Sequence, residues 1–322
     1  MGGMVVVAAV VVLGGDRDAD RGVDVARATL IAFDTTTTAA TPGSTGDDGA
    51  DEQAGVLAIR AAGSLDTVAV ALAVGDGFLI TSTAALSGHR ELVVVIGSRL
   101  EDASVVGHDD RTDVSVIHVD AELVPAASAG DATTPAAGDE VTFIGPDGSP
   151  RPQTVAEPVA SAALRDGTAL VGVMTLEGPL DGVAPWTPAL DEHGAIVGIA
   201  GATAAETPAA VVPIALARGV ADEIIDEGAA SHPVIGVTAR DVTGGAGALV
   251  AALDADGPAA AGGIEPGDII VAVGGTRVAS AAEMVATLRE HEPGDRIAIE
   301  VARAGGQVDC EVELESALDP AA

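Results

Sequence analysis

From Gly55 to about residue 200, the chain alternates between short Val- and Ile-rich runs and turn-forming residues, with Gly, Asp or Pro about every 8–15 residues. Runs such as VLAIRA, TVAVALAV, ELVVVIG and DVSVIHV have the composition of strands. Short strands at this spacing favour a closed barrel or a sandwich over alternating β-α units. A helix is predicted at about 214–227, where apolar residues recur at helical spacing, and Gly228 ends it. We therefore predict a mainly β domain over residues 55–228.

A second domain is predicted over residues 229–318, with both strands and helix. Apolar segments such as VIGVTAR, GALVAAL, DIIVAVGG and RIAIEVAR indicate its strands. A helix is expected at about 280–291, with Ser280 as its N-cap and Glu283 completing a capping box. The tetrapeptide E-P-G-D occurs at 265–268 and again at 292–295, and Pro followed by Gly suits the centre of a type II turn. The second domain is therefore α+β.

The first 54 residues have a different composition. Residues 1–15 form a short apolar segment that as a helix would reach about 22 Å, less than the ~30 Å of a hydrocarbon core. We interpret it as a truncated signal anchor, with a buried strand as the alternative. Residues 16–54 are assigned to a flexible, disordered linker, because 34–54 consist of Thr, Gly, Asp and Ala without apolar periodicity.

Composition excludes several functions. The formal net charge is −34, all 15 basic residues are Arg, and aromatic residues make up 1% of the chain. Such a surface repels phosphate backbones and offers almost no stacking platforms, so nucleic acid is excluded as a partner. We interpret the acidity as an aid to solubility. Cys310 is the lone cysteine and no metal-ligand spacing occurs, so neither a metal nor another cofactor is predicted.

Three segments carry a recognisable pattern of catalytic positions. They are GDGFLITSTAAL (75–86), DDRTDVSVIHV (109–119) and DGVAPWTPALDEHGAIVGI (181–199). They resemble the segments of HtrA-type, trypsin-like serine proteases that carry the general-base histidine, the orienting aspartate and the nucleophilic serine. By this resemblance the three positions are Ala84, Asp113 and Pro185. The family implies a trypsin-like double β-barrel for residues 55–228.

Two of these three positions lack the functional groups that catalysis requires. Pro185 has neither a hydroxyl for attack nor the N–H that would stabilise an oxyanion, and Ala84 has no imidazole. Loss of a triad serine or histidine typically costs about 10⁶ in turnover. Asp113 alone remains, and an Asp after an Arg-Thr turn also commonly caps that turn through hydrogen bonds to the backbone. The chain is therefore predicted to be catalytically inactive.

Other residues do not replace the missing groups. His89 lies in a Ser-Gly turn and His118 in the strand after Asp113, and neither is placed to act as the base without remodelling. Thr187, two residues past Pro185, would still need a base and an oxyanion hole. An active serine endopeptidase with a rearranged site stays open as the competing hypothesis.

The junction and the second domain carry a further resemblance. VVPIALARGVADEIIDEGAASHPVIGV (211–237) and the segment 257–295 are similar to the HtrA junction and PDZ core, so the resemblance implies a C-terminal PDZ domain over 229–318. PDZ domains bind a peptide C-terminus as an added strand, with its carboxylate held by successive N–H groups. The implied peptide-binding residues are Val234, Ile235, Gly236, Val237, Met284 and Leu288. Met284 and Leu288, four apart on one helix face, could equally be core residues.

The leading hypothesis is an inactive HtrA-like homologue that recognises protein C-termini or exposed peptides as an adaptor, sensor or inhibitor-like scaffold. The resemblance also implies a location outside the cytoplasm, and the apolar N-terminal segment suggests a membrane anchor. The alternative is an active serine-type endopeptidase of extracytoplasmic protein quality control. A third reading is a structural envelope protein whose PDZ domain binds nothing. The oligomeric state stays open, because the aromatic-rich segments through which relatives often trimerise are missing.

Overall fold

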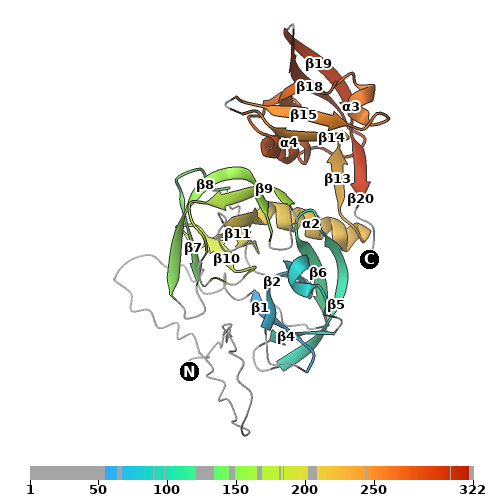
Figure 1. Ribbon diagram of the computed structural model, residues 1–322. Helices are drawn as coiled ribbons and strands as arrows, with labels where there is room; N and C mark the ends of the chain where they lie inside the picture. Colours follow the sequence, from blue (N-terminus) through green and yellow to red (C-terminus); the bar gives the residue numbers. More distant parts are fainter. Residues whose placement is uncertain are drawn as a thin grey trace, which may run out of the picture.

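The structure is a computed structural model, and its described part consists of two β-barrels followed by a smaller domain (Figure 1). It describes residues 55–63, 67–89, 91–96, 99–120, 134–144, 149–164, 169–180, 183, 185–201, 209–243, 245–304 and 306–318. The apolar segment and the linker assigned to residues 1–54 lie outside the described residues.

The first barrel is closed, with strand order β1-β2-β3-β6-β5-β4. Its elements are β1 (Val56–Ala61), β2 (Thr67–Gly75), β3 (Phe78–Ser82), the one-turn helix α1 (Thr83–Leu86), β4 (Leu92–Ile96), β5 (Arg99–Asp109) and β6 (Val114–Val119). Ile59, Leu79 and Ile117 are buried in its interior, where the β-branched and Leu residues of successive strands meet. Closure leaves no free sheet edge in this barrel.

The second barrel is also closed, in the order β10-β11-β12-β9-β8-β7. It comprises β7 (Glu140–Ile144), β8 (Pro150–Ala163), β9 (Ala169–Leu176), β10 (Pro188–Leu190), β11 (Ile196–Ala200) and β12 (Ala210–Pro213). Phe143 and Met174 are buried in its core. Only glycine fits at Gly198, because a methyl group there would lie 2.5 Å from Cγ1 of Val211.

Strand β8 is a strand that the sequence pattern did not indicate. It contains Pro150, Pro152 and Pro158, and proline removes a donor from the ladder. The structure accommodates Pro158 at an irregularity, where the pairing of β8 with β9 shifts register between Glu157 and Ala160. Proline is tolerated at bulges and strand ends, so the strand persists despite its composition.

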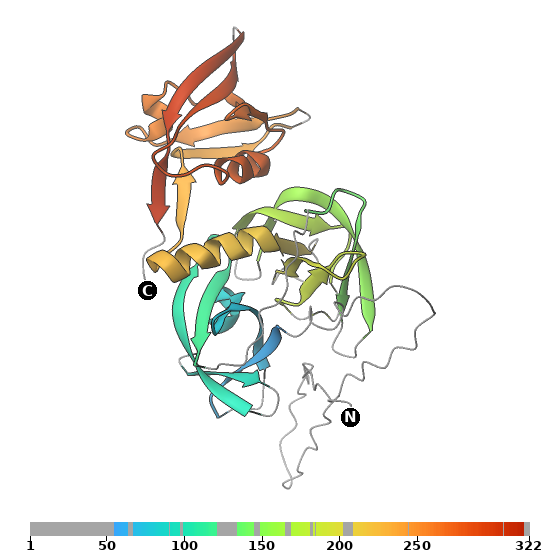
Figure 2. The same ribbon diagram turned by 180° about the vertical axis from the view of Figure 1, so that it is seen from behind.

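Helix α2 (Ile214–Glu227) follows the second barrel and has the predicted extent. It runs across both barrels (Figure 2), and its buried residues share one core cluster with residues of both. A methyl group at Gly107 of β5 would lie 2.7 Å from Cγ2 of Ile224, so the helix packs directly on that strand. Gly228 ends the helix in the left-handed conformation, with φ of 85°.

The C-terminal domain has a five-stranded path, β14-β15-β16-β18-β19, and a separate pair, β13-β20. Its elements are β13 (Ser231–Val234), β14 (Val237–Asp241), β15 (Ala248–Leu253), α3 (Pro258–Ala261), β16 (Ile269–Val273), β17 (Thr276–Arg277), α4 (Ala281–Leu288), β18 (Arg296–Arg303), β19 (Gly306–Glu313) and β20 (Glu315–Leu318). Strand β17 pairs with β16. The domain is α+β, as predicted.

Local sequence signals in this domain act at the predicted places. Ser280 caps α4 as predicted, with its Oγ accepting from Glu283 N at 3.1 Å. The Glu283 carboxylate accepts from Ala279 N at 2.7 Å, one residue before the N–H that the predicted capping box would use. Both E-P-G-D segments are turns whose glycines have positive φ, 96° at Gly267 and 95° at Gly294. Positive φ at the third residue is the mark of a type II turn. The expectation of a trypsin-like double barrel followed by an α+β domain is therefore confirmed.

Candidate functional site

Asp113 lies between the two barrels, at the turn from β5 to β6. Its side chain is 2% exposed and its φ is 60°, in the left-handed region that Asp adopts more readily than most residues. Ser82 Oγ donates to the carboxylate, at 2.9 Å from Oδ1 and 2.8 Å from Oδ2, and the N–H of Ala84 donates to Oδ1 at 2.8 Å. The carboxylate is therefore held by neutral donors from the end of β3 and the start of α1.

Residues 82–85 form a short capped turn of helix beside the Asp113 carboxylate. Ser82 is the N-cap of α1, and its Oγ accepts from Ala85 N at 3.1 Å. The N–H of Thr83 donates to the backbone carbonyl of Asp113 at 3.2 Å. These bonds place Ala84 next to Asp113. The resemblance assigned these two residues to the positions of the base and the orienting aspartate, and they are neighbours in space.

Trp186 approaches the same carboxylate from the second barrel. Its indole Nε1 donates to Asp113 Oδ2 at 3.3 Å, and its backbone N–H donates to the carbonyl of Ala200 at 2.7 Å. The side chain is 2% exposed although its φ is 69°, an unusual backbone conformation for a bulky residue. Sequence reasoning missed Trp186 as a member of the site. The available signal was a lone tryptophan one residue after the serine position, where the HtrA-type loop, which reads G-N-S-G-G-P-L, has glycine.

Pro185 and Val183 precede Trp186 and are half-buried, whereas Ala184, between them, lies outside the described residues. Position 185 therefore carries a pyrrolidine ring, and position 84 a methyl group. His118 lies against Phe78 in a tilted ring contact, with ring centroids 4.9 Å apart. The described arrangement thus supplies a buried carboxylate with its hydrogen bonds in place, but neither the nucleophile nor the base of a serine protease at the expected positions.

A second candidate site lies at the free edge of β14 in the C-terminal domain. The carbonyls of Ile235 and Gly236 accept from Ala259 N at 2.9 Å and Asp254 N at 2.8 Å. Within the described residues, the N–H groups of Ile235 and Gly236 donate no hydrogen bond. Gly236 has φ of 71°, and successive free N–H groups beside a left-handed residue form an anion-binding nest. A loop with these features can bind an anion through its N–H groups.

The other predicted peptide-binding residues are distributed differently. Met284 and Leu288 are only 3% and 4% exposed, inside the core cluster that also contains Ile235. Val234 lies in β13 and pairs with Glu315 of β20. Val237 is half-buried beside this cluster. So are three residues that were not predicted, Ala239 on β14 and Ala281 and Val285 on α4. Their partial exposure leaves apolar surface for a ligand.

Helix α4 also rests on the second barrel. Arg289, at its C-cap, donates from Nη1 to the carbonyl of Val171 on β9 at 2.6 Å. A methyl group at Gly172 would lie 2.9 Å from Arg289 Nη1 and 3.7 Å from Cβ of Ala286. Burial lowers the pKa of the Arg289 guanidinium, an effect that Asp109 opposes and Arg111 reinforces. One helix therefore contacts both the β14 domain and the barrel (Figure 1).

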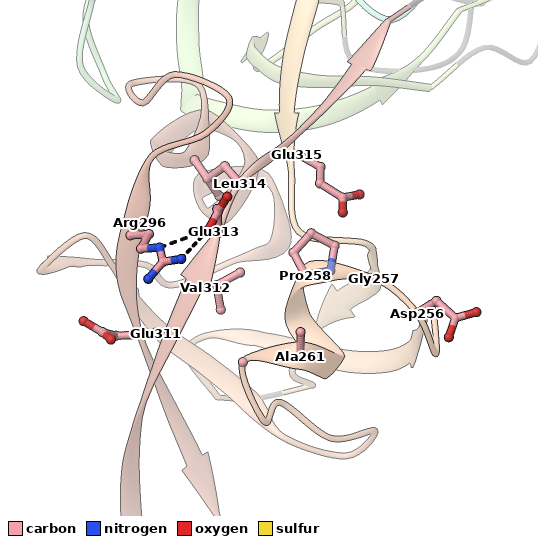
Figure 3. A pocket seen from close by; sticks show the side chains of 11 residues that line it. Asp256, Gly257, Pro258, Ala261, Arg296, Glu311, Val312, Glu313, Leu314 and Glu315 are labelled. Carbon is pink, nitrogen blue, oxygen red and sulfur yellow. Dashed lines mark hydrogen bonds and ion pairs between the residues drawn. The ribbon is translucent and has the colours of Figure 1, made fainter.

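An open pocket of about 370 Å³ lies in the C-terminal domain, between α3 and strands β19 and β20 (Figure 3). Its rim includes Asp256, Glu311 and Glu315. Arg296 is the one basic residue that lines it, and its Nε and Nη2 donate to Glu313 Oε2 at 2.9 and 2.8 Å. Gly257 and Pro258 also line it and lie 3.6 and 3.5 Å from the position that a methyl group on Gly236 would take, so the pocket adjoins the loop before β14.

In the ranges that the structure describes, no group of three or more His, Cys, Asp or Glu could hold a metal ion. Over the same ranges, no helix is long and apolar enough to cross a membrane.

Comparison with known proteins agrees with this geometry. Residues 233–314 match the family model of the PDZ domain. The chain is 27% identical over 271 residues to the serine protease Do-like HtrA of Lactobacillus helveticus, covering 75% of this chain and 66% of that protein. It is 28% identical over 258 residues to a probable periplasmic serine endoprotease DegP-like of Halomonas elongata, covering 71% and 52%. The match therefore spans about half to two thirds of these relatives.

Solved structures agree in fold. The HtrA-type protease AlgW with tripeptide has a TM-score of 0.64 at 22% identity, covering 84% of this chain and 96% of that one. The serine endoprotease from Yersinia pestis has a TM-score of 0.56 at 22% identity, covering 83% and 96%. The resemblance found in the sequence is thereby confirmed: the chain is similar in sequence and fold to HtrA-type serine proteases, and its trypsin-like double barrel precedes a C-terminal PDZ domain.

Proposed function

We propose that this HtrA-like chain is catalytically inactive and binds protein C-termini or exposed peptides through its PDZ domain, as an adaptor or sensor. The observation that carries the first half is the hydrogen bonding of Asp113. Its carboxylate accepts from Ser82, Ala84 N–H and Trp186, while Ala84 and Pro185 stand where base and nucleophile are expected. None of these three donors is a base or a nucleophile, so these hydrogen bonds orient no base and activate no nucleophile.

The second half of the proposal rests on the loop before β14. The N–H groups of Ile235 and Gly236 point to no acceptor among the described residues, and β14 is an edge strand that can accept a further strand. Val237, Ala239, Ala281 and Val285 add half-buried apolar surface beside that edge. This arrangement suits a peptide with a free carboxylate and small or aliphatic side chains near its C-terminus.

Activity is tested with the purified full-length chain. A fluorophosphonate probe and a casein digest are run beside trypsin as the positive control. No labelling and no cleavage are expected. Labelling of the native chain that disappears on heat unfolding would instead support the alternative, an active serine-type endopeptidase of extracytoplasmic quality control, which the names of the relatives favour.

Peptide binding is tested with an array of C-terminal peptides on the full-length chain, each peptide made with a free carboxylate and with an amide. Binding of free acids but not of their amides is expected, because the amide removes the charge that the N–H groups hold. An array without hits would contradict the proposal and favour a structural protein whose PDZ domain binds nothing.

We further propose that the chain works outside the cytoplasm, because curated relatives such as that of Halomonas elongata are described as periplasmic. The apolar segment at residues 1–15 is proposed as its membrane anchor. Cell fractionation of the tagged full chain, with and without that segment, tests both points. Recovery in the cytosolic fraction would refute the location, and an unchanged membrane fraction after deletion would refute the anchor.

A further inference from the structure

The two barrels share one buried carboxylate, and each contributes a donor to it. Ala84 N–H, from α1 of the first barrel, donates to Oδ1 of Asp113, and Trp186 Nε1, from the loop before β10 of the second barrel, donates to Oδ2. We infer that Trp186 occupies the place of the missing base on Asp113 and closes the former catalytic centre. In this pairing, the small side chain of Ala84 leaves the space that the large side chain of Trp186 fills. This inference rests on the proposed lack of activity and adds a reason for it.

The distances at position 84 support this assignment. Because Ala84 N lies 2.8 Å from Asp113 Oδ1, a longer side chain at residue 84 would extend beside the carboxylate that the indole already contacts. An imidazole and the indole would compete for the same acceptor. The indole N–H is a donor without an acceptor, so it can hold the carboxylate but cannot take up a proton from a nucleophile.

The backbone of Trp186 points to the same conclusion. At φ of 69°, residue 186 is in a conformation that glycine adopts freely and that a bulky residue adopts at a cost. The family pattern has glycine at this position. A tryptophan there keeps the glycine conformation and adds a large side chain, which is retained only if its surroundings stabilise it.

Those surroundings come from both barrels. Trp186 is 2% exposed and belongs to the core cluster that contains Val70 and Val116 of the first barrel and Ile196 and Ile199 of the second. Its indole therefore links the barrels by packing as well as by the hydrogen bond to Asp113. The position of the former catalytic centre therefore lacks the reactive groups and is also occupied by the Trp186 side chain.

Thermal unfolding of four full-length proteins tests the pairing: the parent chain, Ala84→His, Trp186→Gly and the double variant. Ala84→His is expected to lower the midpoint in the parent, because the imidazole meets the indole. In the Trp186→Gly background the same change is expected to have a smaller effect or to raise the midpoint, because the space is vacant. Equal effects in the two backgrounds would overturn the inference. Ala85→His, one residue along α1, is the matched control and should be additive with Trp186→Gly.

A second experiment decides the matter if a histidine variant fails to fold. Trp186→Phe keeps a ring but removes the N–H, and Asp113→Asn removes the charge of the acceptor. The inference predicts that the two changes are not additive in their unfolding midpoints, because Trp186→Phe removes the hydrogen bond that Asp113→Asn weakens by removing the acceptor's charge. Additive effects would overturn it.

Fluorescence adds an independent reading of the site, because Trp186 is the one tryptophan of a chain without tyrosine. Its emission should be blue-shifted and protected from acrylamide in the parent, and less protected in Ala84→His. Equal quenching in the two proteins would count against the pairing. The fluorophosphonate assay stays separate: labelling of the parent chain would refute the proposed inactivity, whereas additive midpoints with no labelling would refute the pairing alone.

Discussion

The Nε2 atom of His232, on β13, lies 3.0 Å from Oδ1 of Asp109, the last residue of β5, and both side chains are buried. This contact joins residues 123 positions apart and connects the start of the PDZ domain to the first barrel. Asp109 also accepts from Arg111 N and from Thr112 Oγ1. The pair is therefore part of a buried network at the junction of the domains.

Substitution of His232 by Ala should weaken this junction. The loss of one partner leaves the buried Asp109 carboxylate short of a hydrogen bond, and we expect a destabilisation of about 1–3 kcal/mol. Urea unfolding measures it, and faster limited proteolysis near residue 230 should accompany it. His193→Ala is the control, because that side chain is 78% exposed and surface changes usually stay within about 0.5 kcal/mol. Equal effects of the two substitutions would contradict the role assigned to His232.

Substitution of Gly172 by Ala should disturb the seating of α4 on β9. Both Gly172 and Gly63 have positive φ, 79° and 77°, but a methyl group at Gly172 meets Arg289 whereas one at Gly63 meets nothing within 4 Å. Gly63→Ala should therefore cost only the backbone strain, about 1–2 kcal/mol, and Gly172→Ala a further ~1–3 kcal/mol from overpacking. Chemical denaturation compares them, and indistinguishable losses would show that the helix does not press on this strand.

The stability of the PDZ domain should fall in acid through Asp268. The hydrogen bonds from Arg303, 2.7 Å from Nε to Oδ1 and 2.6 Å from Nη2 to Oδ2, hold the pKa of the Asp268 carboxyl below its ordinary value of 3.8. A lowered pKa in the folded state means that the bound carboxylate stabilises the fold at pH above 3.8. That contribution is lost as the pH falls through the lower, folded-state pKa.

Denaturation of the parent and of Asp268→Asn between pH 2 and 7 measures this effect. The parent should be the more stable protein near neutrality, and the gap should narrow as the pH falls below the ordinary pKa. A gap that stays constant across the range would contradict the assignment. Arg296→Gln, which removes an exposed pair with Glu313, is the control for a general loss of positive charge.

Two substitutions on α4 should separate core packing from peptide binding. Leu288→Ala, at a side chain 4% exposed, should destabilise the domain by about 2–5 kcal/mol. Val285→Asp, at a half-buried position, should reduce the affinity for a free-carboxylate peptide with little loss of stability. Unfolding curves and fluorescence anisotropy of a labelled peptide provide the two readouts. A reversed pattern would place the groove at Leu288 and not at Val285.

The loop before β14 provides a further test of binding. Gly236→Ala introduces no contact shorter than 3.5 Å, so its effect comes from the φ of 71° that alanine resists. We expect a loss of about 1–2 kcal/mol in stability and a clear loss of affinity for free-acid peptides, because the N–H groups turn away from the carboxylate. Unchanged affinity in the anisotropy assay would contradict the assignment of the loop.

Local signals in this chain predicted local structure well. The glycines of the E-P-G-D turns, Ser280 before α4 and Gly228 after α2 act through their own backbone or that of residues within a few positions. Strand β8 was missed because Pro158 argues against a strand, and its bulge depends on pairing with β9, which no local pattern reports. Burial of Met284 and Leu288 was left open for a similar reason, since helical spacing defines a face but not what covers it.

By itself, the sequence determined the β-rich architecture, the order of the two domains and the absence of histidine and serine from the positions at 84 and 185, because composition, turn chemistry and motif spacing are properties of contiguous residues. Only the tertiary structure decided which side chain contacts Asp113 in place of a histidine. Trp186 is 73 residues away along the chain, and its indole reaches the carboxylate because the two closed barrels pack against each other. The same is true of His232 and Asp109, whose contact exists only once the PDZ domain rests on the barrels.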